Sequence, residues 1–219
     1  MSIEIRITAD GSPTLYVPEL DETYHSQHGS VQEANHVFIQ HGLTCFREFS
    51  EPIRILEVGY GTGLNALLTA QYASEKGLPI HYVGLEAFPI SDSIWTQLNY
   101  LQSQEGAALY ASLMEATWNE AVHVFPGFTL EKRAQKLQEF SASTVFDLVY
   151  FDAFGPKAQS EMWALETLRI VYQALKTGGV LVTYCAQGQF KRALKALGFV
   201  VESLPGPPGK REMTRARKI

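Results

Sequence analysis

The chain has 219 residues, of which 46% are hydrophobic and 19% are charged, and its formal net charge is −5 at pH 7. This length and composition are ordinary for a globular protein and suffice for one sizeable α/β domain with a small extension. No apolar run reaches the roughly 18 residues that span a membrane, and the N-terminus lacks the layout of a secretory signal. Cys45 and Cys185 are far apart and no histidine pattern accompanies them, so we expect reduced thiols, no metal site and a cytoplasmic protein.

The first 50 residues predict a small extension on a larger domain. Residues 3–7 alternate apolar and polar side chains, as a half-buried strand does. The turn pair Asp10-Gly11 and residues 15–17 complete a predicted hairpin. Residues 30–33 have the S-x-x-E form of a capping box and open a predicted helix with apolar residues near one side.

A glycine-rich motif follows at residues 53–63, which read Ile-Arg-Ile-Leu-Glu-Val-Gly-Tyr-Gly-Thr-Gly. An apolar run ends in Glu57, glycines follow at Gly59, Gly61 and Gly63, and helix-forming residues come next. A strand, a glycine loop and a helix N-terminus in this order are typical of a cofactor site. Glu57 would repel a pyrophosphate but attract the ammonium group of S-adenosylmethionine. The G-x-G-x-G spacing therefore resembles the first motif of class I methyltransferases; the alternative is a glycine-rich turn that binds nothing.

The rest of the chain alternates predicted strands and helices. Strands are predicted at 80–86, 128–130, 146–152 and 180–184. Helices are predicted from residue 91, at 106–117, at 160–176 before Gly178-Gly179, and at 187–197. A closing antiparallel pair of strands is predicted at 199–202 and 211–215. This alternation indicates a mostly parallel sheet covered on both faces. We predict an α/β, Rossmann-like class I methyltransferase fold with an antiparallel edge over residues 51–219, preceded by a hairpin-and-helix extension, 1–50, with the boundary near residues 50–52.

Two acids end predicted strands, at the edge where ligands of open α/β sheets bind. Glu86 can accept hydrogen bonds from the ribose hydroxyls of a nucleoside cofactor. NAD enzymes place an acid similarly, so Glu86 does not identify the cofactor, and a surface acid is the alternative. Asp152 begins the run Asp152-Ala153-Phe154-Gly155-Pro156 and can orient an amine nucleophile and accept its proton. The alternative for Asp152 is a cap on the following turn.

Polar residues before the glycine loop allow two interpretations. Glu33 either completes the capping box with Ser30 or belongs to the site. Tyr24 and Ser26 are either packing residues or part of a lid over the cofactor.

Charge is distributed unevenly along the chain. Residues 191–219 contain eight basic and two acidic residues, a net charge of +6, which leaves −11 for the remainder. This asymmetry indicates either a face that contacts a polyanion or a solvated tail.

The chain resembles the methyltransferase domain of the bifunctional tRNA-modification enzyme MnmC and its free-standing, MnmD-like relatives. The resemblance runs through nearly the whole chain. It rests on residues 24–29 with Glu33 and 36–39, 57–65, 151–157 with 161–163, 178–184 and 209–213. Relatives often carry a Gly-Asp pair near the adenine where this chain has Lys132-Arg133, so the adenine contact is left open.

The resemblance implies methyl transfer from S-adenosylmethionine to the amine of 5-aminomethyl-2-thiouridine at the tRNA wobble position. Together with the motifs, it implies three groups of site residues. The catalytic group is Asp152, Phe154 and Glu33; the cofactor group is Tyr24, Ser26, Glu57, Gly59, Gly61, Gly63, Asn65, Glu86 and Asp152; the substrate or RNA group is Lys157, Lys210 and Arg211. Phe154 or Trp163 would stack on a base, although core packing is the simpler role for Trp163.

The expected partner is the tRNA anticodon loop. Because the chain has no flavin-dependent oxidase half, we expect a separate flavin-dependent or wobble-uridine-modifying enzyme to supply the aminomethyl substrate. Three other functions are kept open: methylation of a small-molecule amine, non-catalytic binding of a nucleoside and RNA, and NAD-dependent oxidoreduction.

Overall fold

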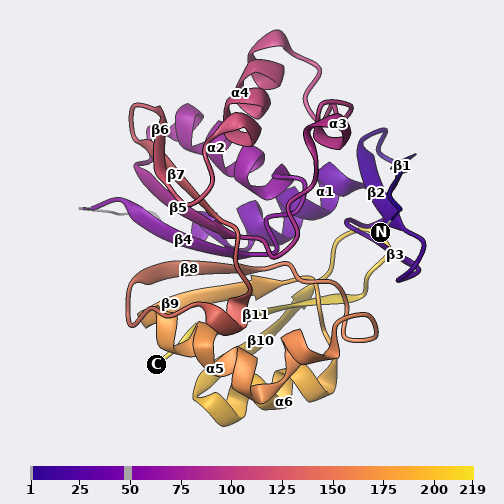
Figure 1. The fold of residues 1–219 in the computed structure, drawn as a ribbon. Helices are drawn as coiled ribbons and strands as arrows, with labels where there is room; N and C mark the ends of the chain where they lie inside the picture. The colour runs from indigo at the N-terminus through magenta and orange to yellow at the C-terminus, as the bar shows by residue number, and fades with distance from the viewer. Residues whose placement is uncertain (1, 47–50) are drawn as a thin grey trace.

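A computed structural model describes residues 2–46 and 51–219, and its centre is an eight-stranded sheet (Figure 1). The strand order is β10-β11-β9-β8-β4-β5-β7-β6. The strands are β4 (Ile53–Val58), β5 (Ile80–Leu85), β6 (Ala121–Phe125), β7 (Phe128–Arg133), β8 (Phe146–Phe151), β9 (Leu175–Thr183), β10 (Phe199–Pro205) and β11 (Glu212–Lys218). The five strands from β9 to β7 are parallel, whereas β11 pairs antiparallel with both β9 and β10. This arrangement confirms the predicted mostly parallel sheet with an antiparallel edge.

The chain reverses direction across the sheet between β4 and β8. Strand β4 pairs in parallel with β5 on one side and with β8 on the other, so Glu57 lies opposite both Gly84 and Tyr150. The chain leaves β4 toward the β5 edge and later returns to β8. In open α/β sheets, ligands bind at the carboxyl ends of the strands beside such a switch point. The end of β4 is therefore where the fold positions a site.

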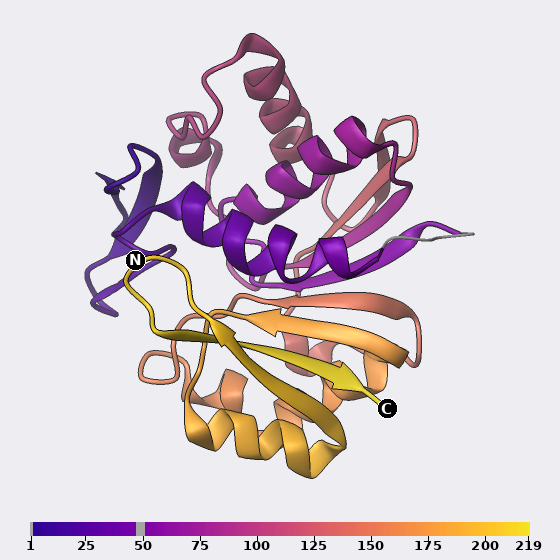
Figure 2. The ribbon, with the colours of Figure 1, turned by 180° about the vertical axis from the view of Figure 1, so that it is seen from behind.

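Helices cover both faces of the sheet, because alternate strand residues are apolar on both sides. On one face lie α1 (Ser30–Ala34), α2 (Leu64–Lys76) and α4 (Gln104–Glu115), and on the other lie α5 (Leu165–Ala174) and α6 (Gly188–Leu197), as Figures 1 and 2 show. Ile55 packs in the first layer and its neighbour Leu56 in the second, and neither is exposed to solvent. The predicted helix from residue 91 is the single turn α3 (Asp92–Trp95).

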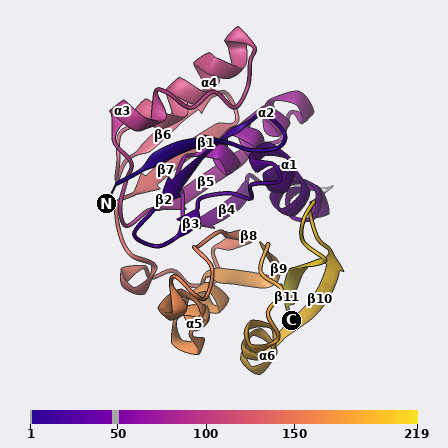
Figure 3. The ribbon, with the colours of Figure 1, turned by 90° about the vertical axis from the view of Figure 1, so that its right-hand side faces the viewer.

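The N-terminal residues form a small antiparallel sheet of β1 (Glu4–Ile7), β2 (Pro13–Val17) and β3 (Glu22–Thr23). Figure 3 shows this sheet at the end of the molecule where β4 and β8 finish. The prediction that residues 3–7 are half-buried was wrong: Ile7 is 70% exposed, since β2 supplies the buried face through Leu15. The predicted boundary near residues 50–52 adjoins residues 47–50, which lie outside the described part of the chain.

The helix that follows the small sheet is not a continuous α-helix. After α1, residues Asn35–Gln40 are π-helical and Leu43–Cys45 form a 3₁₀ turn. Val37 and Phe38 in the π-helical segment pack in the same core layer as Ile55. The extension therefore shares its core with the main sheet.

One further prediction was only partly right, and one strand was not predicted. The helix expected at 160–176 is a 3₁₀ turn, Ser160–Trp163, followed by α5, and β9 already begins at Leu175. The Lys218 ammonium donates to the carbonyls of Tyr172 and Leu175, so a distant side chain and not Gly178-Gly179 satisfies the end of this helix. Strand β6 was not predicted, because it is a half-exposed edge strand that forms only by pairing with β7.

Among the described residues, no helix combines the length and apolar character that crossing a membrane requires.

A lysine is buried in the layer that contains α4. Lys132 is 1% exposed, and its ammonium donates to the carbonyl of Met114 near the end of α4, 4.8 Å from the centre of the Trp118 ring. A cation at a helix C-terminus is favourable, but burial disfavours the charged form. Burial lowers the pKa of Lys132 from 10.5 to about 8.

This burial predicts a stability difference that depends on pH. Between about pH 8 and pH 10.5 the folded protein binds fewer protons at Lys132 than the unfolded chain does, so the stability contribution of this residue rises with pH. Between pH 7.5 and pH 10, the melting temperature of wild type should rise relative to that of a Lys132→Met variant. Lys195→Met removes an exposed lysine, and its melting temperature should change with pH as that of wild type does. If the melting temperatures of wild type and Lys132→Met change equally with pH, the lowered pKa of Lys132 is contradicted.

Candidate active site

The loop after β4 has a backbone that only glycine adopts easily. Gly59, Gly61 and Gly63 have φ angles of 88°, 51° and 75°, and α2 begins at Leu64. A Cβ atom at Gly59 would lie 2.6 Å from the carbonyl oxygen of Asp152. The glycine therefore allows the loop after β4 and the residue after β8 to touch.

Two carboxyl groups meet at the side chain of Asn65, in the first turn of α2. The Asn65 Nδ2 atom donates to Glu57 Oε1 and to Asp152 Oδ2, each at 2.8 Å. The other Glu57 oxygen accepts a hydrogen bond from the Tyr82 hydroxyl at 2.8 Å, and Glu57 has no exposed surface. Burial raises the pKa of Glu57 well above its ordinary value. Glu57 thus lies inside the protein beneath the loop, and it does not line the cavity described below.

Asp152 follows directly after β8 and is half-buried. Its backbone N–H donates to the carbonyl of Val58, so its position is set by the end of β4. Burial, and secondly the charge of Glu33, raise the pKa of Asp152 to about 7 against the lowering effects of Asn65 and Lys210. A carboxyl group with this pKa can hold or release a proton near neutral pH.

Glu86 and Tyr24 both contact the glycine loop at Gly61. The Glu86 carboxylate accepts hydrogen bonds from the N–H groups of Gly61 and Phe88, both at 2.9 Å. The Tyr24 ring packs against Gly61, where a Cβ would lie 3.1 Å from it, and meets the Phe154 ring edge-on with centroids 5.0 Å apart. The small sheet thereby covers the loop.

A cavity of ≈740 Å³ opens beside Asp152. Its walls come from segments far apart in sequence: residues 22–26, Glu33, 153–157, 184–187 and 210–212. Tyr24, Ser26, Glu33, Phe154, Lys157, Lys210 and Arg211, all expected in the site, line this cavity. The glycines, Glu57, Asn65 and Glu86 lie on the other side of Asp152, around the loop. Asp152 is therefore linked to the loop through Gly59 and Asn65 and to the cavity through the residues that follow it.

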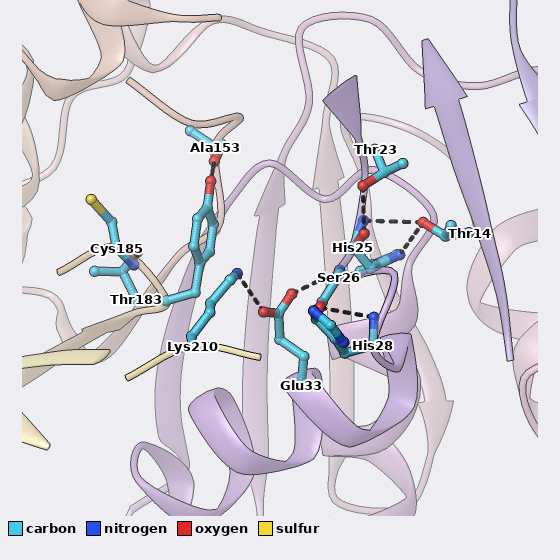
Figure 4. Close-up of polar contacts among 11 residues, drawn as sticks. Thr14, Thr23, His25, Ser26, His28, Glu33, Ala153, Thr183, Cys185 and Lys210 are labelled. Atoms are coloured by element: carbon cyan, nitrogen blue, oxygen red, sulfur yellow. Dashed lines mark hydrogen bonds and ion pairs between the residues drawn. The ribbon is translucent and has the colours of Figure 1, made fainter. Parts of the chain in front are cut away.

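Glu33 does not form the capping box that its spacing suggests. Gly29 precedes α1 without a side-chain cap, and the Ser30 hydroxyl donates instead to the carbonyl of Pro13. The Glu33 carboxylate accepts a hydrogen bond from the Ser26 N–H at 3.0 Å and forms an ion pair with Lys210 (Figure 4). Helix α1 therefore directs Glu33 into the cavity.

Two wall residues were missed in the sequence. The Tyr184 hydroxyl donates to the carbonyl of Ala153 at 2.8 Å, and its ring centre lies 3.9 Å from the Lys210 ammonium. Tyr184 directly follows β9, and this strand-end position is a signal that could have identified it. His25 also lines the cavity, and burial lowers its pKa to about 4, so the imidazole is neutral at pH 7.

Lys132 and Arg133, at the expected position of the adenine contact, interact with other parts of the protein. Lys132 lies in the core, as described above, and Arg133 forms an ion pair with Glu131 at 2.7 Å. Trp163 is 8% exposed and its indole N–H donates to the Phe154 carbonyl at 2.8 Å. Trp163 thus packs in the core and supports the backbone at Phe154.

Several basic side chains of the C-terminal segment have partners within the chain. Lys191, Lys210 and Arg215 form ion pairs with Glu212, Glu33 and Glu202, and Arg217 and Lys218 donate to backbone carbonyls. Lys157 and Arg211 are exposed residues of the cavity wall, and neither takes part in an ion pair within the described residues.

Comparisons with known proteins bear on this arrangement. A family of sequences described as S-adenosyl-L-methionine-dependent methyltransferase matches residues 128–219. The bifunctional tRNA 5-methylaminomethyl-2-thiouridine biosynthesis protein MnmC of Acidovorax sp. (strain JS42) is 32% identical over 99% of this chain and 35% of its own length. The MnmC protein of Cupriavidus metallidurans is 30% identical over 96% of this chain and 33% of its own. The chain thus spans about a third of the length of these curated relatives.

Solved structures extend the comparison. The crystal structure of MnmC2 from Aquifex aeolicus has a TM-score of 0.84 and 26% identity, covering 99% of this chain and 70% of that one. Spermidine synthase from Thermotoga maritima, at 14% identity and a TM-score of 0.56, shares the fold alone. The chain therefore has the fold of the class I S-adenosylmethionine-dependent methyltransferases, as its sequence predicted, and is homologous over nearly its whole length to the methyltransferase region of the MnmC proteins.

Proposed function

We propose that the protein transfers a methyl group from S-adenosylmethionine to the amine of 5-aminomethyl-2-thiouridine at the wobble position of tRNA. The observation that carries the proposal is the position of Asp152. Its backbone touches the glycine loop at Gly59, its carboxyl group is held by Asn65, and the residues that follow it line the cavity. A carboxyl group at this junction stands between a cofactor loop and a substrate compartment. The similarity to MnmC proteins supports an amine on tRNA as the acceptor.

The residues around the loop fit this cofactor. The Asn65 Oδ1 atom is buried and has no hydrogen-bond partner among the described residues, so it offers an acceptor to an ammonium group. Glu86 offers carboxylate oxygens to ribose hydroxyls, and the three glycines allow close approach to the backbone. Tyr24 and Ser26 cover the ligand from the small sheet. When bound, S-adenosylmethionine supplies a methyl group attached to a positively charged sulfur.

The chain's own residues prepare the amine. An amine attacks only when its nitrogen is unprotonated and aimed at the methyl carbon. Asp152, with a pKa of about 7, accepts the proton and orients the nitrogen. Glu33 supplies a second carboxylate on the opposite wall, and Phe154 offers its ring to the uracil base. We assign catalytic roles to these three residues on this basis.

The RNA is proposed to approach the cavity mouth. Sequence-specific RNA recognition targets unpaired bases, so the wobble base of the anticodon loop enters the cavity splayed out. Lys157 and Arg211 on the wall contact phosphates, and a separate flavin-dependent or wobble-uridine-modifying enzyme supplies the aminomethyl group. We also propose that residues 1–50 act as an extension that closes the substrate side of a methyltransferase domain, 51–219, working in the cytoplasm.

One observation favours a second candidate, methylation of a small-molecule amine. Because Lys210 is paired with Glu33 and Lys218 is buried against backbone carbonyls, part of the +6 charge of residues 191–219 is not available to RNA. Activity that is insensitive to salt and prefers a free amine over tRNA would support this alternative.

The substrate proposal is tested by incubation with labelled S-adenosylmethionine and two tRNA preparations, one bearing the aminomethyl group and one lacking it. Label should enter only the aminomethylated tRNA, because only that tRNA presents a primary amine at the wobble base. Transfer to a different substrate, with none to this tRNA, would exclude the proposal.

The role of Asp152 predicts a kinetic separation. Asp152→Asn should lower kcat by about 10²–10⁴-fold, as expected for loss of a general base, and change the Kd of S-adenosylmethionine little. In wild type, kcat/KM should rise with pH through about 7 as the carboxyl group of the free enzyme ionises, and this rise should disappear in the variant. An unchanged kcat would remove Asp152 from the mechanism.

The role of Arg211 predicts a change in salt dependence. Arg211→Ala should weaken tRNA binding and reduce the slope of log K against log salt by about one unit, because one phosphate contact is lost. Arg192→Ala, which removes an exposed arginine on α6, is the matched control and should leave the slope unchanged. Equal slopes in all three proteins would argue against a phosphate contact at Arg211.

A further inference from the structure

The Lys210 ammonium occupies a site built from an aromatic ring and a carboxylate. Lys210 lies in the loop between β10 and β11, whereas Glu33 lies on α1, and their side chains meet across the cavity (Figure 4). On its other side the ammonium lies 3.9 Å from the centre of the Tyr184 ring. A cation over an aromatic face with a carboxylate beside it is how proteins bind alkylammonium groups.

The walls of this site, Tyr184 and Glu33, are fixed by contacts that do not involve Lys210. The Tyr184 hydroxyl is tied to the Ala153 carbonyl, which holds the ring next to Asp152. The Glu33 carboxylate accepts from the backbone N–H of Ser26, which the small sheet positions. Because both walls keep their own supports, the site stays formed when the lysine leaves. We call Tyr184 and Glu33, with Asp152 behind them, the ammonium site.

We propose that the ammonium site receives the primary ammonium group of the substrate, and that Lys210 fills this site in the free protein until the substrate displaces it. This inference rests on the proposed function, since it names the pocket that the substrate amine enters before it reaches Asp152. It also gives Lys210 two states. Once displaced from Glu33, its charge is available to a phosphate of the bound RNA.

The displacement requires a movement of the Lys210 side chain alone. This side chain is 32% exposed, so its ammonium can leave Glu33 toward solvent. Exchange of one ammonium for another at Glu33 changes no net charge inside the cavity. The exchange therefore avoids leaving a buried carboxylate unpaired, which would be costly.

Ethylammonium tests the site without RNA. Calorimetric titration of ethylammonium chloride into protein saturated with S-adenosylhomocysteine should give a Kd about tenfold lower for Lys210→Ala than for wild type, because the internal competitor is gone. Lys195→Ala removes an exposed lysine that does not line the cavity, and should bind as wild type does. Ethanol should bind none of the proteins. Equal ethylammonium affinity for wild type and Lys210→Ala would overturn the proposal.

The walls are tested in the Lys210→Ala background. Adding Tyr184→Phe should preserve ethylammonium binding, since the ring remains, whereas adding Tyr184→Leu should abolish the tenfold gain. Thermal unfolding verifies that each variant is folded, and if the leucine variant is not, Glu33→Gln replaces it and should also lose the gain. Retained binding in a folded variant lacking the ring or the carboxylate would refute the site. Ethylammonium binding without methylation of aminomethylated tRNA would leave the site standing and refute only the proposed function.

Discussion

The bridge made by the Asn65 amide is the interaction on which the site depends. One nitrogen donates to Glu57 at the end of β4 and to Asp152 after β8, both at 2.8 Å. Burial raises the pKa of both carboxyl groups, and the Asn65 amide opposes this rise by donating a hydrogen bond to each of them. Because Asn65 lies in the first turn of α2, the same hydrogen bonds also hold the start of the helix that follows the glycine loop. The Asn65 side chain thus links the helix start to Asp152, whose backbone is held by the end of β4.

Around this shared centre, the parts that distinguish the protein come from the chain ends. The sheet resembles that of spermidine synthase, at a TM-score of 0.56 and 14% identity, so the sheet alone says little about the acceptor. The cavity beside Asp152 is closed by Tyr24 and Glu33 from the first 50 residues and by Lys210 near the C-terminus. These segments meet only in the fold, and their charges and rings determine which molecule enters. The same C-terminal segment also stabilises the fold, as Lys218 shows by satisfying carbonyls at the end of α5.

The sequence predicted the glycine loop, Asp152 at a strand end and the closing antiparallel pair. These features depend on residues that are adjacent in the chain, so local patterns are enough to recognise them. The sequence did not predict features that depend on distant partners. Glu33 has the spacing of a capping residue, yet Ser26 and Lys210 draw it into the cavity. The sequence suggested Glu57 as a ligand for an ammonium group, yet its carboxyl group is buried and hydrogen-bonded by Tyr82 and Asn65. Strand β6 exists only because β7 offers an open edge.

A crystal structure of the protein with S-adenosylhomocysteine and an anticodon stem-loop bearing the aminomethyl group would test the central claim most directly. The claim is that Asp152 joins a cofactor compartment to a substrate compartment. It predicts the cofactor against residues 59–63, the substrate nitrogen beside the Asp152 carboxyl group, and Lys210 withdrawn from Glu33. A wobble base bound outside the cavity, or a substrate nitrogen remote from Asp152 while the cofactor occupies the loop, would contradict it.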